Sequence, residues 1–116
     1  MTQEEKDLLL QDLCGRLPYD VRIHVNDRVE TLQGLNILDN VAEYGSFLCC
    51  DIEDVKPYLF PMSSMTEEQT KEYQRLFSLR VFPNFHIMDW LNKNHFDYQG
   101  LIRKSLAIDA TRLNIY

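Results

Sequence analysis

The residues best suited to metal or acid–base chemistry lie in the last third of the chain. His86 and Asp89 are three positions apart, which places both side chains on one face of a helix, and His95 follows shortly after. Such a set could offer two or three ligands to a metal ion. It lacks the dense pairs, H-E-x-x-H or C-x-x-C, that mark metal sites. We therefore expect neither a metal nor a cofactor, with His86 on the surface and His95 bonded to backbone groups at a helix end.

Nucleophilic catalysis has equally little support. Cys49 and Cys50 fall within a predicted strand, where buried thiols are inert, and no G-x-S-x-G occurs. The carboxylates of 51–54 fit a solvated strand end better than an acid–base pair. None of the four glycines belongs to a phosphate-binding motif. We expect a protein that is not an enzyme, and a small enzyme or metal-binding protein ranks third among the functions considered.

An aromatic-rich stretch, 82–98, offers a different kind of chemistry. It contains the only tryptophan of the chain and two of its three histidines. Exposed aromatic residues beside charged ones are typical anchors of protein interfaces. Packing of Trp90 on the first helix or on the sheet is the equally weighted alternative. The leading hypothesis is a non-catalytic module that binds another protein, with these contact residues: Trp90, Lys93, His95 and Tyr98.

Charge is unevenly distributed, although the net charge is −6. Residues 39–72 carry eight acidic side chains and two basic ones, whereas residues 73–116 carry three acidic and six basic ones. A solvated dipolar exterior is the simpler reading. The alternative is nucleic-acid binding by a basic, aromatic C-terminal half, because cations combined with aromatic rings suit single strands. It would use Arg75, Arg80, Lys93, Arg103 and Lys104 with Trp90, Phe96 and Tyr98.

Three helices must position these residues. Thr2 and Thr66 each begin a capping box, and the segment that follows each is predicted to be helical. In the first helix, Leu9, Leu10, Leu13 and Cys14 form the buried stripe, and Gly15 ends it. In the second helix, Tyr73, Leu76 and Phe77 are the predicted buried residues. Pro83 begins the third helix, and its apolar face is formed by Ile87, Met88 and Leu91. Asn94 ends this helix. Asp97 is then predicted to cap a further helix, which would complete a helix–turn–helix hairpin.

Alternating and apolar segments at 21–25, 28–32, 35–38 and 47–52 predict strands. A three-residue loop would pair Val25 with Val29 and place His24 across from Glu30, which keeps the apolar faces matched. Residues 106–108 could form a late strand or an extended tail. The predicted class is α+β: an N-terminal helix, a small curved antiparallel sheet of three to five strands that could be SH3-like, and a helical C-terminal half.

Length and composition indicate the number of domains and the expected cellular compartment. A chain of 116 residues with 45% hydrophobic content fits one globular domain, 1–116. No apolar run reaches the roughly 18 residues that a membrane helix needs. Three cysteines, an odd number, fit reduced thiols, and the acidic N-terminal segment is unlike a secretory signal. We expect a cytoplasmic protein without membrane contact, and oligomeric state stays open.

Two segments carry a family resemblance: 54–68 (DVKPYLFPMSSMTEE) and 91–102 (LNKNHFDYQGLI). Both resemble a family of small uncharacterised proteins encoded in phages, prophages and mobile elements of gut anaerobes, and the similarity extends from residue 8 to about residue 108. The family has no assigned activity, cofactor or catalytic residue. The resemblance implies a small accessory role, such as modulating a host or phage protein.

Overall fold

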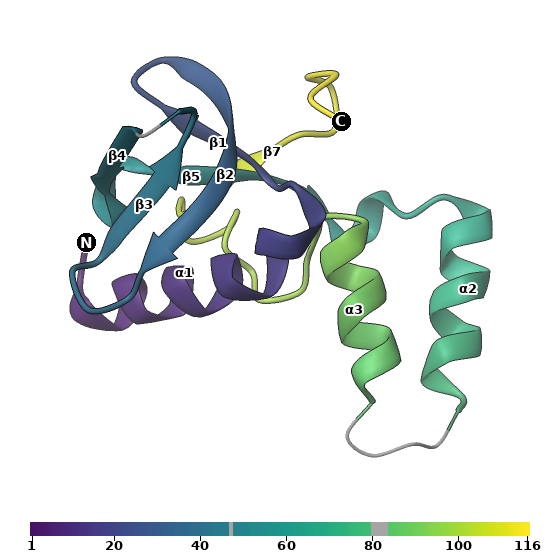
Figure 1. Ribbon diagram of the computed structural model, residues 1–116. Helices are drawn as coiled ribbons and strands as arrows, with labels where there is room; N and C mark the ends of the chain where they lie inside the picture. Colours follow the sequence, from purple (N-terminus) through teal and green to yellow (C-terminus); the bar gives the residue numbers. More distant parts are fainter. Residues whose placement is uncertain (47, 80–83) are drawn as a thin grey trace.

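A computed structural model describes residues 1–46, 48–79 and 84–116. The fold is α+β (Figure 1). The chain begins with helix α1 (Gln3–Arg16) and the short turn η1 (Leu17–Tyr19). Strands β1 (Arg22–Val25), β2 (Arg28–Asn36), β3 (Val41–Tyr44) and β4 (Leu48–Asp51) follow, then η2 (Ile52–Asp54), β5 (Lys56–Pro61) and η3 (Met62–Ser64). Helices α2 (Glu67–Phe77) and α3 (Phe85–Lys93) precede two short strands, β6 (Phe96–Asp97) and β7 (Ile108–Asp109).

The sheet is larger and more mixed than predicted. Its described strands follow the order β4-β3-β2-β1-β5-β6, and β7 also pairs with β5. The strands β1 to β5 pair antiparallel, whereas β6 and β7 both pair with β5 in parallel. The prediction of an antiparallel sheet with three to five strands was therefore wrong in number and direction, and the topology lends no support to an SH3-like barrel. The late strand at 106–108 is confirmed in part, because β7 begins at Ile108.

The hairpin between β1 and β2 corrects a predicted register. Val25 pairs with Arg28, and His24 pairs with Val29 rather than with Glu30. The loop contains only Asn26 and Asp27, both with positive φ (50° and 58°). Two left-handed residues give the turn a twist that matches the strands, and asparagine and aspartate tolerate that conformation. Apolar residues face polar ones here because this end of β2 is exposed, and Arg28 therefore need not be buried.

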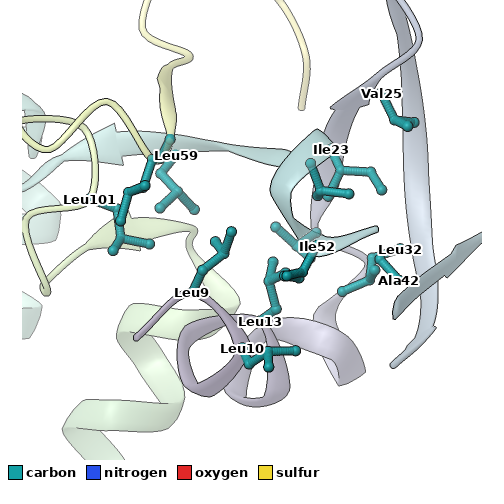
Figure 2. Packing of buried hydrophobic residues seen from close by; sticks show 14 of the residues in the cluster. Leu9, Leu10, Leu13, Ile23, Val25, Leu32, Ala42, Ile52, Leu59 and Leu101 are labelled. Carbon is teal, nitrogen blue, oxygen red and sulfur yellow. The ribbon is translucent and has the colours of Figure 1, made fainter. Parts of the chain in front are cut away.

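The hydrophobic core lies between α1 and the sheet. Figure 2 shows leucines of α1 facing Ile23, Leu32 and Ala42 from the strands, with Leu59 and Leu101 close by. Both predicted capping boxes are present, at Thr2 and Thr66, and they fix where α1 and α2 begin. None of the described helices combines the length and apolar character needed to cross a bilayer.

Two predictions about the end of α1 were wrong. Cys14, predicted in the buried stripe, is exposed, while Asp12 and Arg16 are fully buried. The helix also passes through Gly15 and ends at Arg16. Gly15 serves a close approach instead, since a Cβ there would lie 3.0 Å from Nδ2 of Asn92. The small residue lets α3 pack against α1.

Candidate functional site: the tip of the helical hairpin

Helices α2 and α3 form a hairpin that projects away from the sheet and α1 (Figure 1). The Thr66 capping box begins α2, and Asn84 caps α3 by accepting a hydrogen bond from the Ile87 amide at 3.1 Å. The Asn84 amide also donates to the carbonyl of Leu76 at 2.8 Å, which ties the end of α2 to the start of α3. The predicted start of this helix at Pro83 lies outside the described residues. The side chains near the turn are therefore held on two short, capped helices.

At the base of the hairpin, aromatic rings join it to the body. Trp90 stacks on Phe96 with ring centroids 5.6 Å apart and an interplanar angle of 24°. The ring of Tyr73 from α2 also lies near Trp90, with ring centroids 6.2 Å apart. Phe96 is buried and belongs to β6, which pairs with β5. These contacts give Trp90 a packing role between the hairpin and the sheet.

At the other end, the hairpin exposes large apolar side chains. Phe77 is 69% exposed and Phe85 is 68% exposed. Leu79 and Met88 are also exposed. We define these four residues, Phe77, Leu79, Phe85 and Met88, as the tip surface. The prediction that Phe77 is buried was wrong: the buried residue of α2 is Leu76, and Phe77 lies one position further round the helix.

Three of the four predicted contact residues are engaged inside the protein. Trp90 belongs to the aromatic contact just described. The Tyr98 hydroxyl donates to Oδ1 of Asn92 at 2.8 Å, and its ring lies 5.0 Å from the Arg16 guanidinium carbon. His95 stacks on Tyr116 with centroids 3.7 Å apart. Lys93 alone among the four is exposed, and the role of all four in binding stays a prediction.

The environment of His95 disfavours its charged form. Burial, reinforced by the positive charges of Arg16 and Arg22, lowers the pKa of the imidazole to about 4. The residue has φ of 62°, and its carbonyl accepts a hydrogen bond from Phe60 N at 2.8 Å. The ring is therefore neutral at pH 7 and is packed by its surroundings, which makes His95 an unsuitable cationic anchor for a partner.

The described part of the chain contains no group of three or more His, Cys, Asp or Glu side chains placed to hold a metal. His86 and Asp89, the pair considered from spacing, are both exposed on α3. Cys49 and Cys50 lie in the middle of β4 as predicted, but the expectation that both thiols are buried was wrong, because Cys49 is exposed and Cys50 is only partly buried. Burial, with the nearby charges of Asp54, Cys49 and Asp51, raises the pKa of Cys50 to about 11, so that its thiol stays protonated.

The basic residues considered for nucleic-acid binding differ in their surroundings. Arg75 donates two hydrogen bonds to Glu72, at 3.1 and 2.7 Å, which offsets its charge. Lys93, Arg103 and Lys104 are exposed, and Arg80 lies outside the described residues. The aromatic residues of that hypothesis, Trp90, Phe96 and Tyr98, have partners within the protein. Nucleic-acid binding stays a prediction, with no observation that favours it over the tip surface.

Sequence reasoning missed the tip surface because it assigned the apolar residues of both helices to buried faces. A signal was available: residues 76–88 contain more large apolar side chains than two short helices packed on each other can cover. Comparison with models of protein families, with curated proteins and with solved structures found no match for this chain.

Proposed function

We propose that this protein is a non-catalytic module that binds another protein through the tip surface. The observation that carries the proposal is the exposure of Phe77 and Phe85, each more than two thirds open to solvent, at the end of a hairpin that projects from the body. Large aromatic residues are strong interface anchors because they bury much apolar area at little entropic cost. The accessory role and the phage or mobile-element setting stay predictions from the family resemblance.

The size of the tip surface fits this role. A phenylalanine side chain can bury roughly 150–250 Å², so Phe77 and Phe85 together expose roughly 200–350 Å². With Leu79 and Met88 added, the tip surface is comparable to the largest apolar patch on a typical monomer, about 300–600 Å² and often functional.

Polar side chains surround the tip surface. Gln74 and Arg75 of α2 are exposed, and so are His86 and Asp89 of α3. An apolar centre with a polar rim is the usual organisation of a protein interface. The occupant we propose is an apolar groove or concave surface on another protein, because the apolar residues lie at a projecting end.

The test is affinity capture from a lysate of the source organism, at low and high salt, with and without nuclease. Wild type is compared with the double variant Phe77→Ser/Phe85→Ser. The matched control is Ile37→Ser/Leu38→Ser, which removes two apolar side chains from the turn between β2 and β3, where Leu38 is 94% exposed. We expect wild type and control to retain the same protein after salt and nuclease, and the tip variant to retain at least tenfold less.

Two outcomes would contradict the proposal. Equal capture by the tip variant would remove the tip surface from the interaction, and capture that disappears with nuclease would favour nucleic acid.

Sedimentation of the purified protein identifies a second copy as the occupant if wild type self-associates and the tip variant does not. Flotation with phosphatidylcholine vesicles tests a lipid surface in the same way.

A further inference from the structure

Strand β4 leaves one side of the sheet open. It is the last strand in the sheet order, beside β3 alone. The Ile52 amide donates to the Asn40 carbonyl at 2.9 Å, so Asn40 and Ile52 form a hydrogen-bonded pair. Hydrogen-bonded and non-hydrogen-bonded pairs alternate along an antiparallel ladder. Leu48 and Cys50 therefore bond to β3, while the N–H and C=O groups of Cys49 and the N–H group of Asp51 point away from the sheet. The Asp51 carbonyl belongs to the N-cap of η2.

These three groups of Cys49 and Asp51 have no backbone partner in the strand pairs or in the turn and loop hydrogen bonds of the described residues. An open edge of this kind is a template on which another chain can add a strand. The edge is short, since β4 contains only Leu48–Asp51. A pairing segment would need further contacts to be held in place.

A hollow beside the edge offers one such contact. It has a volume of about 620 Å³ and is lined by Gln33, Glu43 and Cys49 from three neighbouring strands, together with Tyr44, Gly45, Ser46 and Leu48. Leu48 is 48% exposed. Apolar and polar groups share the lining, so the hollow fits one large side chain of a segment that lies along β4.

The acidic side chains near β4 indicate that the pairing segment should be basic. Glu43 faces Cys49 across the β3–β4 pair, and Asp51, Glu53 and Asp54 follow along the chain. All four carboxylates belong to exposed residues, and Lys6 pairs with Glu53 at 2.9 Å. The Glu43 carboxylate leans over Gly34 of β2, where a Cβ would lie 2.6 Å from its Oε2, so the negative charge at the edge itself comes from Asp51 and Asp54. A second copy of this chain is a poor occupant, because edge-to-edge pairing of two β4 strands would bring these carboxylates together.

We infer that the β4 edge accepts an extended, basic segment of another protein as an additional strand. Main-chain hydrogen bonds to Cys49 and to the Asp51 amide supply the pairing, lysine or arginine side chains lie beside Asp51 and Asp54, and one bulky side chain enters the hollow. In Figure 1, β4 and the α2–α3 hairpin lie on opposite sides of the molecule, so this surface is separate from the tip surface.

The probe is a synthetic eight-residue peptide that alternates lysine and valine, with phenylalanine in place of one central lysine so that it shares the face of the remaining lysines. Its binding to the full chain is measured by fluorescence anisotropy and by the amide proton shifts of Cys49 and Asp51. Two further peptides carry N-methyl groups on every second residue, one on the odd positions and the other on the even positions. A strand bonded along one side loses its hydrogen bonds in only one of the two methylated peptides.

We expect saturable binding of the basic peptide and loss of at least tenfold in affinity for one methylated peptide but not the other. The variant Asp51→Asn/Asp54→Asn should bind at least tenfold more weakly. The control Glu67→Gln/Glu68→Gln, which removes as many carboxylates from the hairpin, should bind like wild type. Asn at position 51 keeps an oxygen for the hydrogen bond from the Glu53 amide.

The inference would be overturned if both methylated peptides lost affinity equally, or if a peptide with glutamate in place of lysine bound as tightly as the basic peptide. Binding that is undetectable at millimolar peptide would overturn it as well. The Phe77→Ser/Phe85→Ser variant keeps the β4 edge and should bind the basic peptide normally. Failure of the tip surface and failure of the β4 edge are therefore distinguishable.

Discussion

At the scale of single residues, buried charge is concentrated where α1 meets the segment after α3. Arg16 is fully buried and holds Asp12 through two hydrogen bonds, at 2.7 and 3.1 Å, and it also donates to the Phe96 carbonyl at 2.7 Å. Burial raises the pKa of Asp12, and the Arg16 guanidinium opposes that rise. The buried Asp12–Arg16 pair thus specifies how α1 docks on β6. The i, i+4 spacing of the two residues does not reveal this role, since most pairs with that spacing lie on the surface of a helix.

His95 gives a prediction at this scale. Its pKa is about 4 in the folded protein and about 6.5 when unfolded. Between these pH values the unfolded chain binds a proton that the folded protein does not. The free energy of unfolding therefore decreases as pH falls from about 6.5 towards 4. Above about pH 6.5 the imidazole is neutral in both states, and the full stability is retained. We expect His95→Asn, which tolerates the positive φ, to flatten the pH dependence of stability in this interval.

The measurement is urea unfolding of wild type and His95→Asn at pH 7, 6, 5 and 4.5. The variant also loses the stack on Tyr116, so the difference between pH values is compared rather than absolute stability. Parallel curves for the two proteins would show that His95 titrates normally.

At the scale of elements, the capping motifs in the sequence correctly predicted where helices begin, whereas the predictions of which helix residues are buried were partly wrong. Both capping boxes occur where Thr2 and Thr66 predicted them, because a cap depends on residues within one turn. Phe77 and Cys14 are exposed although each borders an apolar stripe, because the width of a buried face depends on which neighbours pack there. The same holds for the β1–β2 loop, whose register follows from backbone conformation at Asn26 and Asp27.

The β1–β2 turn yields a prediction for an element. Asp27 is exposed and has φ of 58°, a conformation that glycine adopts without the penalty paid by other residues. We expect Asp27→Gly to raise the free energy of unfolding by about 0.5–1 kcal/mol, because Asn-Gly is the preferred pair for this turn. Thermal unfolding with Asp27→Ala as the control should show the opposite change. A change of the same sign in both variants would mean that the turn differs from the one described here.

At the scale of the whole molecule, the C-terminal segment joins parts that are distant in sequence. The Tyr116 hydroxyl donates to the Tyr58 carbonyl at 2.7 Å and accepts from the Arg22 amide at 2.9 Å. Its ring stacks on His95 and lies 5.7 Å from Phe60. Burial raises the pKa of Tyr116 to about 12, so the hydroxyl keeps its proton at neutral pH. One side chain thus connects β1, β5 and the loop after α3.

We therefore expect Tyr116→Phe to lower the free energy of unfolding by about 1 kcal/mol, through the loss of two hydrogen bonds to backbone groups. Tyr116→Ala should lower it further, because the stack on His95 is lost as well. Urea unfolding measures both variants. Equal stability of Tyr116→Phe and wild type would show that water replaces these hydrogen bonds without cost.

The prediction of a further helix capped by Asp97 was wrong, because Asp97 belongs to β6 and no helix follows it among the described residues, so the helical hairpin is formed by α2 and α3 instead. The sequence by itself determined the α+β class, the starts of α1 and α2, and the end of α3 at Asn94. These features depend on short-range periodicity and on caps, which a segment expresses whatever surrounds it. Only the tertiary structure decided the strand order, the parallel pairing of β6 and β7 with β5, the burial of Asp12 and Arg16, and the exposure of the tip surface and the β4 edge. Each of these depends on contacts between residues far apart in the chain, which no local pattern encodes.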